Sequence, residues 1–173
     1  GAVMRPAVVL ESGSDPPGPC VSAGIHPERA GPRVDLAYGA LRLAMRGEDA
    51  CGDSWHLSVR EGQATLTVID GLGHGLPATD AAQEGTRRAA DAGVDAPNPP
   101  IEALHQAMSG PRGGAVAVAT LPLAGRELQF SGTGNINAGI ADATTSRGLA
   151  SMPGTARVHF LQPPAAPDLA PHG

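Results

Sequence analysis

The fold is decided by residues 53–71, which read DSWHLSVREGQATLTVIDG. Apolar and polar residues alternate over residues 55–59 and again over residues 64–69, a pattern typical of β-strands. The intervening residues 60–63, Arg-Glu-Gly-Gln, favour a tight turn. We therefore predict an antiparallel β-hairpin at the centre of the chain.

The register of this hairpin brings two acidic residues together. If Arg60 pairs with Gln63 across the turn, Asp53 pairs with Asp70, with Cα atoms roughly 4.5–5.5 Å apart. Like charges this close destabilise a strand pair unless a cation lies between them. Oxygen ligands of this kind favour Mg or Mn over Zn, and nearby His74 could bind or orient a water on the metal. The competing interpretation is a plain turn, because Asp-Gly is a common turn dipeptide.

The rest of the chain predicts strands in blocks with helices between them. Strands are expected at residues 34–44, 115–121, 127–132 and 136–141, and helices at residues 77–92 and 100–108. This order predicts an α+β fold in which antiparallel sheet packs against helices. The glycine-rich segment before the first helix, residues 71–75, predicts either an anion site at a helix N-terminus or a plain tight turn.

Composition excludes several classes of function. The 173 residues suit one domain, and all twelve basic residues are Arg, so chemistry that needs Lys is excluded, including a Walker-type phosphate loop and a pyridoxal cofactor. With a net charge of −5 and no basic cluster beyond Arg87-Arg88, we expect no nucleic-acid partner. No apolar run is long enough for a membrane span, and we expect no membrane association. Cys20 and Cys51 form no paired-thiol motif and favour free thiols in the cytoplasm.

Proline and glycine divide the chain into three parts. Residues 1–33 are predicted to be a loosely held Pro/Gly-rich extension, residues 34–158 the folded domain, and residues 159–173 a Pro-rich tail that forms neither helix nor central strand.

Several short motifs in order resemble one family. They are Gly52-Asp53, then Asp70-Gly71-Leu72-Gly73-His74-Gly75, Arg112-Gly113-Gly114-Ala115, Gly132-Thr133-Gly134-Asn135-Ile136 and Ser151-Met152-Pro153-Gly154-Thr155. Over about residues 34–157 the chain resembles the metal-dependent PPM serine/threonine phosphatases, and most of all their small bacterial SpoIIE-like branch, which includes the stressosome phosphatase.

The resemblance implies a fold, a metal centre and a reaction. The implied fold is an α-β-β-α sandwich of antiparallel sheets with flanking helices, and the implied cofactor is a two-metal Mn²⁺ or Mg²⁺ centre. Asp70 would bridge the metals, the Gly71 carbonyl would bind one of them, and Asp53 would be a further ligand, direct or through water. The metals would activate a water for attack on phosphoserine or phosphothreonine. Arg112 is a candidate phosphate clamp; the alternative is a surface turn arginine.

The chain also departs from the family. Relatives supply two further metal-binding aspartates, whereas the only aspartates after Arg112 are Asp142 and Asp168, and neither follows a strand pattern. Asn135 stands where many relatives have an aspartate. We therefore expect a domain that is incomplete at its C-terminus, either a truncated chain or a natural variant with an incomplete site. A missing last strand would leave a sheet edge uncovered and favour self-association.

Three hypotheses follow. The first is a phosphatase that acts on a phosphorylated regulatory protein in bacterial stress or sigma-factor control. The second is a non-catalytic PPM-like binding module with a degraded metal site. The third is an unrelated α+β domain that carries the motifs by chance.

Overall fold

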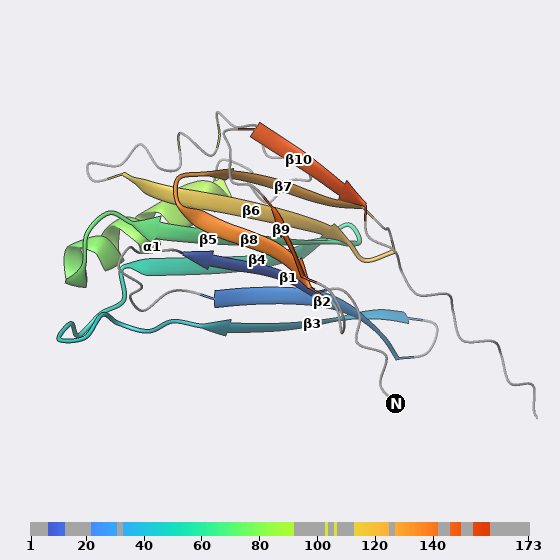
Figure 1. Ribbon diagram of the computed structural model, residues 1–173, viewed down its shortest axis with the longest axis horizontal. Coiled ribbons are helices and arrows are strands. Elements are labelled where there is room, and N and C mark those ends of the chain that lie inside the picture. The colour runs from blue at the N-terminus through green and yellow to red at the C-terminus, as the bar shows by residue number, and fades with distance from the viewer. Residues whose placement is uncertain are drawn as a thin grey trace, which may run out of the picture.

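Two antiparallel sheets lie face to face in the computed structural model (Figure 1). The structure describes residues 7–12, 22–30, 33–91, 103, 106, 113–124, 127–141, 146–149 and 154–159. One sheet, here the N-terminal sheet, has the order β3-β2-β1-β8-β9, and the other, the hairpin sheet, has the order β10-β7-β6-β5-β4. All neighbouring strands in both sheets are antiparallel.

The strands have the following bounds. The N-terminal sheet consists of β1 (Ala7–Ser12), β2 (Ser22–Ala30), β3 (Arg33–Leu41), β8 (Ile136–Ala141) and β9 (Ser146–Leu149). The hairpin sheet consists of β4 (Asp53–Arg60), β5 (Gln63–Gly71), β6 (Gly114–Pro122), β7 (Glu127–Thr133) and β10 (Gly154–His159).

The main hydrophobic core lies between the two sheets. Leu66 and Val68 alternate along β5 and both belong to this core, together with Leu10 of β1 and Ile136 of β8. Phe130 of β7 is the largest of its wholly buried side chains. Burial of these apolar groups is the main force that holds the sheets together.

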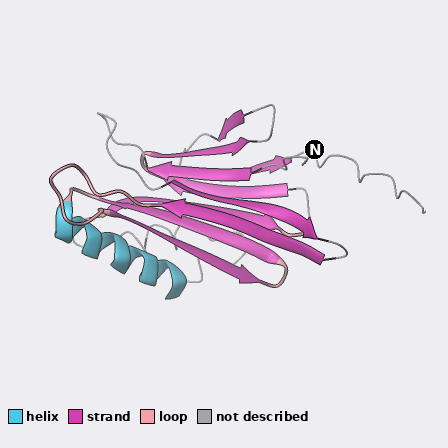
Figure 2. Cartoon of the chain, turned by 90° about the horizontal axis from the view of Figure 1, so that it is seen from below, coloured by secondary structure: helices cyan, strands magenta, loops and turns pink. Residues whose placement is uncertain are grey.

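Among the described residues one long helix, α1 (Gly75–Asp91), packs on the outer face of the hairpin sheet (Figure 2). The side of α1 that faces the sheet is built from small residues, which let the helix approach closely: Gly75, Ala78, Thr79, Ala82, Gly85 and Ala89. Ala82 and Ala89 pack with Ile69 of β5 and with Val116 and Val118 of β6 in a second buried cluster. The strand β5 is therefore covered on both faces, which explains why it is buried along almost its whole length.

Most of the predicted elements are confirmed. The hairpin is β4–β5, the helix predicted at 77–92 is α1, and the strands predicted at 34–44, 115–121, 127–132 and 136–141 are β3, β6, β7 and β8. The helix predicted at 100–108 falls mostly outside the described residues. Ala103 and Gln106 are described there, and both are helical. Within the described ranges, no helix is long and apolar enough to cross a membrane.

The structure differs from the prediction at the N-terminus. Residues 1–33, interpreted as a loosely held extension, contain strands β1 and β2, and β1 lies between β2 and β8 inside the N-terminal sheet. The physical reason is that Leu10 is buried in the inter-sheet core, so this short apolar run gains more from burial than the surrounding Pro and Gly residues cost. The predicted Pro-rich tail lies outside the described residues from 160 onward. Self-association through an open edge stays a prediction.

The turn of the hairpin offers a first test. Glu61 and Gly62 both have positive φ, 50° and 74°, as a two-residue type I′ turn requires. Glutamate is strained in this region, whereas asparagine tolerates it. We expect Glu61→Asn to raise the free energy of unfolding by about 0.5–1 kcal/mol in urea denaturation. Glu61→Gln is the control, because it removes the charge without easing the strain; an equal gain in both variants would contradict this account.

Candidate functional site

The β4–β5 register places two carboxylates face to face. Arg60 pairs with Gln63 at the turn, and seven residues further from the turn Asp53 pairs with Asp70, as predicted. Asp53 opens β4 and Asp70 is the last residue but one of β5, so the pair lies at the end of the sheet away from the turn. Asp53 is only 7% exposed and Asp70 is half-buried.

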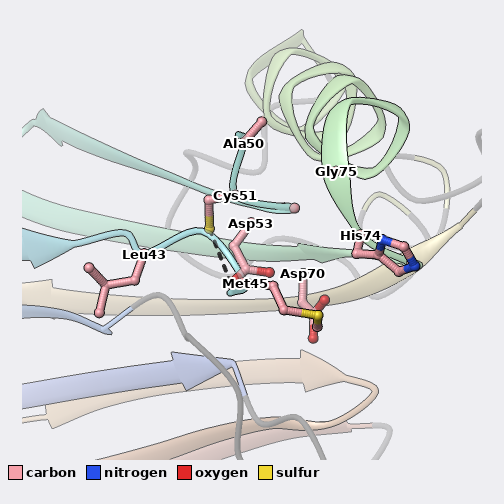
Figure 3. Close-up of a pocket in the computed structure, with 10 residues that line it drawn as sticks. Leu43, Met45, Ala50, Cys51, Asp53, Asp70, His74 and Gly75 are labelled. Carbon is pink, nitrogen blue, oxygen red and sulfur yellow. Dashed lines mark hydrogen bonds between the residues drawn. The ribbon is translucent and has the colours of Figure 1, made fainter. Parts of the chain in front are cut away.

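A small pocket of about 60 Å³ opens at this end of the sheet (Figure 3). Asp53 and Asp70 line it on the sheet side. Leu43 and Met45, from the loop between β3 and β4, line it on one side, and residues 73–75, which lead into α1, line it on the other. The pocket is therefore built where two loops meet the end of the hairpin.

The electrostatics of the pocket disfavour two negative charges. Burial and then the charge of Asp53 raise the pKa of Asp70 to about 6, and a hydrogen bond between the two carboxyls acts in the same direction. Asp70 thus holds a proton more tightly than an isolated aspartate would. A cation placed between them would relieve the same repulsion.

Two further side chains contact the carboxylates. Asn135, in the turn between β7 and β8, forms a side-chain hydrogen bond with Asp70, and this contact opposes the rise in the pKa of Asp70. The Cys51 thiol donates to Asp53 Oδ2 over 3.8 Å. In the sequence, Asn135 is notable only because many PPM phosphatases have an aspartate at this position. Its contact with Asp70 depends on the sheet, which brings the β7–β8 turn beside the end of β5.

A carboxylate–histidine pair lies at the side of the pocket. His74 Nδ1 lies 2.6 Å from Glu48 Oε1, and the imidazole is largely exposed. Glu48 occupies Nδ1, so any hydrogen bond from His74 to a ligand in the pocket must use Nε2. Glu48 was not predicted as a site residue. It lies 26 residues from His74 in the sequence, and no local pattern connects the two.

Close backbone packing holds the loop that follows Asp70. The Gly71 N–H donates to the Gly52 carbonyl over 3.0 Å, and the Thr79 hydroxyl donates to the Cys51 carbonyl over 2.8 Å. The first contact joins the end of β5 to the residue before β4, and the second joins the start of α1 to the loop before β4. A side chain at position 71 would meet the backbone oxygens of Ala78 and Gly52, so glycine is required there.

The donor set fits a hard divalent cation, but only in part. Two carboxylates in hydrogen-bond contact present the oxygen ligands that Mg²⁺ and Mn²⁺ prefer, and the repulsion that raises the pKa of Asp70 would be relieved by a cation. Among the described residues, however, no three His, Cys, Asp or Glu side chains come together as a metal-binding group. Of the predicted site residues, Asp53, Asp70 and Gly71 come together here, whereas Arg112 lies outside the described residues.

Comparison with solved structures gives similar folds, among them the following three. A chain from a structure entitled "The bacterial stressosome: a modular system that has been adapted to control secondary messenger signaling" is 23% identical, with a TM-score of 0.59, and the match covers 81% of this chain and 71% of that one. RsbX, crystallised with magnesium, is 16% identical at a TM-score of 0.57, with 82% and 69% covered. The PP2C phosphatase domain of SpoIIE from Bacillus subtilis is 12% identical at 0.58, with 82% and 50% covered.

These likenesses concern the fold. No protein-family model and no curated protein matches the sequence. At these identities the structural matches establish a PPM-like arrangement of antiparallel sheets and leave activity open. The predicted fold class, a PPM-like α+β arrangement of antiparallel sheets, is thereby confirmed, and its incompleteness at the C-terminus stays a prediction.

The acidic pair predicts an unusual pH dependence of stability. Because the pKa of Asp70 is raised to about 6 in the folded protein, its contribution to stability is full below about pH 4 and is lost as the pH rises through 6. In chelator-treated protein we expect this loss to be about 1–2 kcal/mol, reduced by the partial exposure of Asp70. The measurement is urea denaturation of the wild type and Asp70→Asn between pH 4 and pH 7.

The difference in the free energy of unfolding between the wild type and Asp70→Asn reports on the Asp70 carboxyl. Asp70→Asn should become more stable relative to the wild type as the pH rises, while Asp91→Asn, at an exposed position at the end of α1, should show no such trend. A difference in the free energy of unfolding that stays constant from pH 4 to pH 7 would contradict an unfavourable contact between Asp53 and Asp70.

The glycine at position 71 gives a second test. A Cβ there would lie 2.5 Å from the Ala78 carbonyl oxygen and 2.8 Å from that of Gly52, both backbone atoms that cannot move aside cheaply. We expect Gly71→Ala to lower the free energy of unfolding by about 2 kcal/mol or more. Gly39→Ala in β3 is the matched control, since no atom lies within 4 Å of its added Cβ. Equal effects of the two substitutions in urea would contradict the close approach.

Proposed function

We propose that the protein is a metal-dependent phosphatase that hydrolyses phosphoserine or phosphothreonine on a bacterial signalling regulator. One observation carries the proposal: Asp53 and Asp70 face each other at the end of the hairpin sheet, beside a pocket. Two partly buried carboxylates in contact are costly for the fold. Their cost is explained if they hold a cation on which a phosphate group can bind.

The fold likeness supports this choice of chemistry. The domain of SpoIIE that matches is named a PP2C phosphatase, and RsbX is named as a complex with magnesium. The stressosome match adds a signalling context. The stress-response role, the phosphorylated regulator as partner, Mn²⁺ or Mg²⁺ as cofactor and a cytoplasmic location come to this chain as parts of the proposal.

Each residue of the pocket has a proposed role. Asp53 and Asp70 would hold the metal, with the Gly71 carbonyl as a further oxygen ligand. Bound divalent metal supplies Lewis acidity, which activates water and neutralises charge on the phosphoryl group. Asn135 keeps the Asp70 carboxylate oriented through its hydrogen bond. Glu48 holds the His74 ring at the side of the pocket, with Nε2 as the nitrogen available to a ligand.

Arg112 remains the proposed phosphate clamp, since a guanidinium group matches phosphate oxygens. Its neighbour Gly113 supports this role: the Gly113 carbonyl accepts a hydrogen bond from the Leu72 N–H over 3.4 Å. The backbone that follows Arg112 therefore contacts the loop of the pocket.

A non-catalytic binding module is the second candidate. The observation that favours it is the absence, within the described ranges, of any group of three potential metal ligands. Such a module would bind a phosphorylated partner without hydrolysing it. The two candidates differ in metal dependence and turnover, so the same experiments separate them.

Metal binding is the direct test of the site. We expect calorimetric titration of Mn²⁺ to show binding with a dissociation constant on the order of 10⁻⁴ M or weaker, because few charged ligands give weak sites. Asp70→Asn should abolish this binding, and Asp91→Asn, at an exposed position at the far end of α1, should leave it unchanged. Mn²⁺ binding that survives Asp70→Asn would place the metal elsewhere.

Turnover then decides between the candidates. With Mn²⁺ present, we expect the wild type to release phosphate from p-nitrophenyl phosphate and from a phosphoserine peptide, and Asp70→Asn to reduce the rate by more than about 100-fold. Binding of the phosphopeptide without phosphate release, unaffected by Asp70→Asn, would favour the binding module and contradict the phosphatase.

A further inference from the structure

Exposed apolar side chains gather around the acidic pocket. Leu43 and Met45 line the pocket from the β3–β4 loop and are 50% and 44% exposed. Leu72 and Leu76 flank the pocket-lining segment 73–75, each next in sequence to one of its glycines, and are 61% and 66% exposed. We call these four side chains the apolar rim. Figure 3 shows Leu43 on one side of the two aspartates and His74 and Gly75 on the other, with the Met45 side chain overlapping Asp70 in this view.

The rim is not explained by packing. The helix α1 buries alanine, glycine and threonine against the sheet and leaves Leu76, its largest apolar residue, in solvent. Gly73 and Gly75 have positive φ, 100° and 68°, and a Cβ at Gly75 would lie 2.5 Å from Glu48 Oε2. The backbone of this segment is thus built in a glycine-dependent conformation that leaves Leu72 and Leu76 outside the core. Single exposed leucines are common, but clusters around a pocket mark interaction surfaces.

Charge does not dominate the same surface. The β3–β4 loop carries two basic residues, Arg42 and Arg46, and two acidic ones, Glu48 and Asp49, so it has no net charge. At the pocket itself, the facing carboxylates of Asp53 and Asp70 lie beside the Glu48–His74 pair. A phosphorylated segment would thus meet a metal-dependent site for its phosphate and apolar surface for its flanking residues.

We infer that the apolar rim selects the substrate: a phosphorylated segment of a partner protein in which large apolar residues flank the phosphoserine or phosphothreonine. The inference rests on the proposed function and deepens it. With the phosphate in the pocket, the phosphorylated residue enters between the two sides of the rim. Its neighbours on either side then lie over Leu43 and Met45 or over Leu72 and Leu76, and burial of apolar surface favours binding.

Two synthetic peptides test the selection. One carries Leu-pSer-Leu and the other Gln-pSer-Gln, which matches it in size and charge. Rates of phosphate release with Mn²⁺ are compared as kcat/KM, and binding of fluorescein-labelled peptides is measured by anisotropy. We expect the wild type to prefer the leucine peptide by about tenfold, the effect of burying about one leucine side chain.

Two double variants and one control locate the effect. Leu72→Gln with Leu76→Gln, and separately Leu43→Gln with Met45→Gln, should each reduce the preference to about twofold or less. Val59→Gln changes a side chain that is 53% exposed but lies at the other end of β4, about 20 Å along the strand from Asp53, and should keep the full preference. Thermal unfolding of each variant checks that the fold is retained.

The outcomes separate this inference from the proposed function. If the wild type hydrolyses both peptides equally well, the phosphatase stands and the rim inference is overturned. If nothing is hydrolysed, the phosphatase fails, and anisotropy decides the rim: a leucine preference that both double variants lose supports it, and equal binding of the two peptides overturns it. A preference lost equally in Val59→Gln would also overturn it.

Discussion

The register of the β4–β5 hairpin is the constraint on which the rest of the site depends. A two-residue turn with positive φ at both positions pairs Arg60 with Gln63 and, because side chains alternate strictly along a strand, brings Asp53 opposite Asp70. A shift of one residue would move every side chain of β4 to the other face and remove the carboxylate pair. The strand β5 cannot shift without cost, since it is buried between the opposite sheet and α1. Two layers of packing therefore hold an unfavourable electrostatic contact in place.

The contact between Asp53 and Asp70 affects both the stability of the fold and the proposed binding of a cation. The raised pKa of Asp70 means that the folded protein binds a proton at this pair more tightly than the unfolded chain does, and any cation that enters would replace the proton. The residues around the two carboxylates act mainly through packing and hydrogen bonds that position the pair, rather than through their charge. Gly71 contacts Gly52 through the backbone, Thr79 joins the helix start to Cys51, and Asn135 holds Asp70 from the neighbouring turn. A pocket so defined favours a small hard cation and disfavours an extended organic ligand.

In our interpretation, the acidic pocket binds the phosphate group, and the surface around the pocket determines which phosphorylated segment is preferred. The acidic pocket treats every phosphorylated residue alike, because a phosphate presents the same oxygens in every protein. Discrimination must then come from the neighbouring surface, and the apolar rim on both sides of the pocket is the surface available. The likeness to the three solved structures at 12–23% identity concerns the fold, and loops on a shared fold are where recognition surfaces vary.

The sequence by itself determined the hairpin, its register, the Asp53–Asp70 pair and helix α1, because each depends on contacts between residues close in the chain. Alternation, turn chemistry and helix termination are local, and they are visible without knowledge of the fold. Only the tertiary structure decided the rest. Strands β1 and β2 were missed because a Pro- and Gly-rich segment becomes strand only when Leu10 can enter a core made by distant strands. Likewise the Glu48–His74 pair, the contact of Asn135 with Asp70 and the apolar rim join segments that no local pattern connects, since it is the packing of sheets and loops that places them at one pocket.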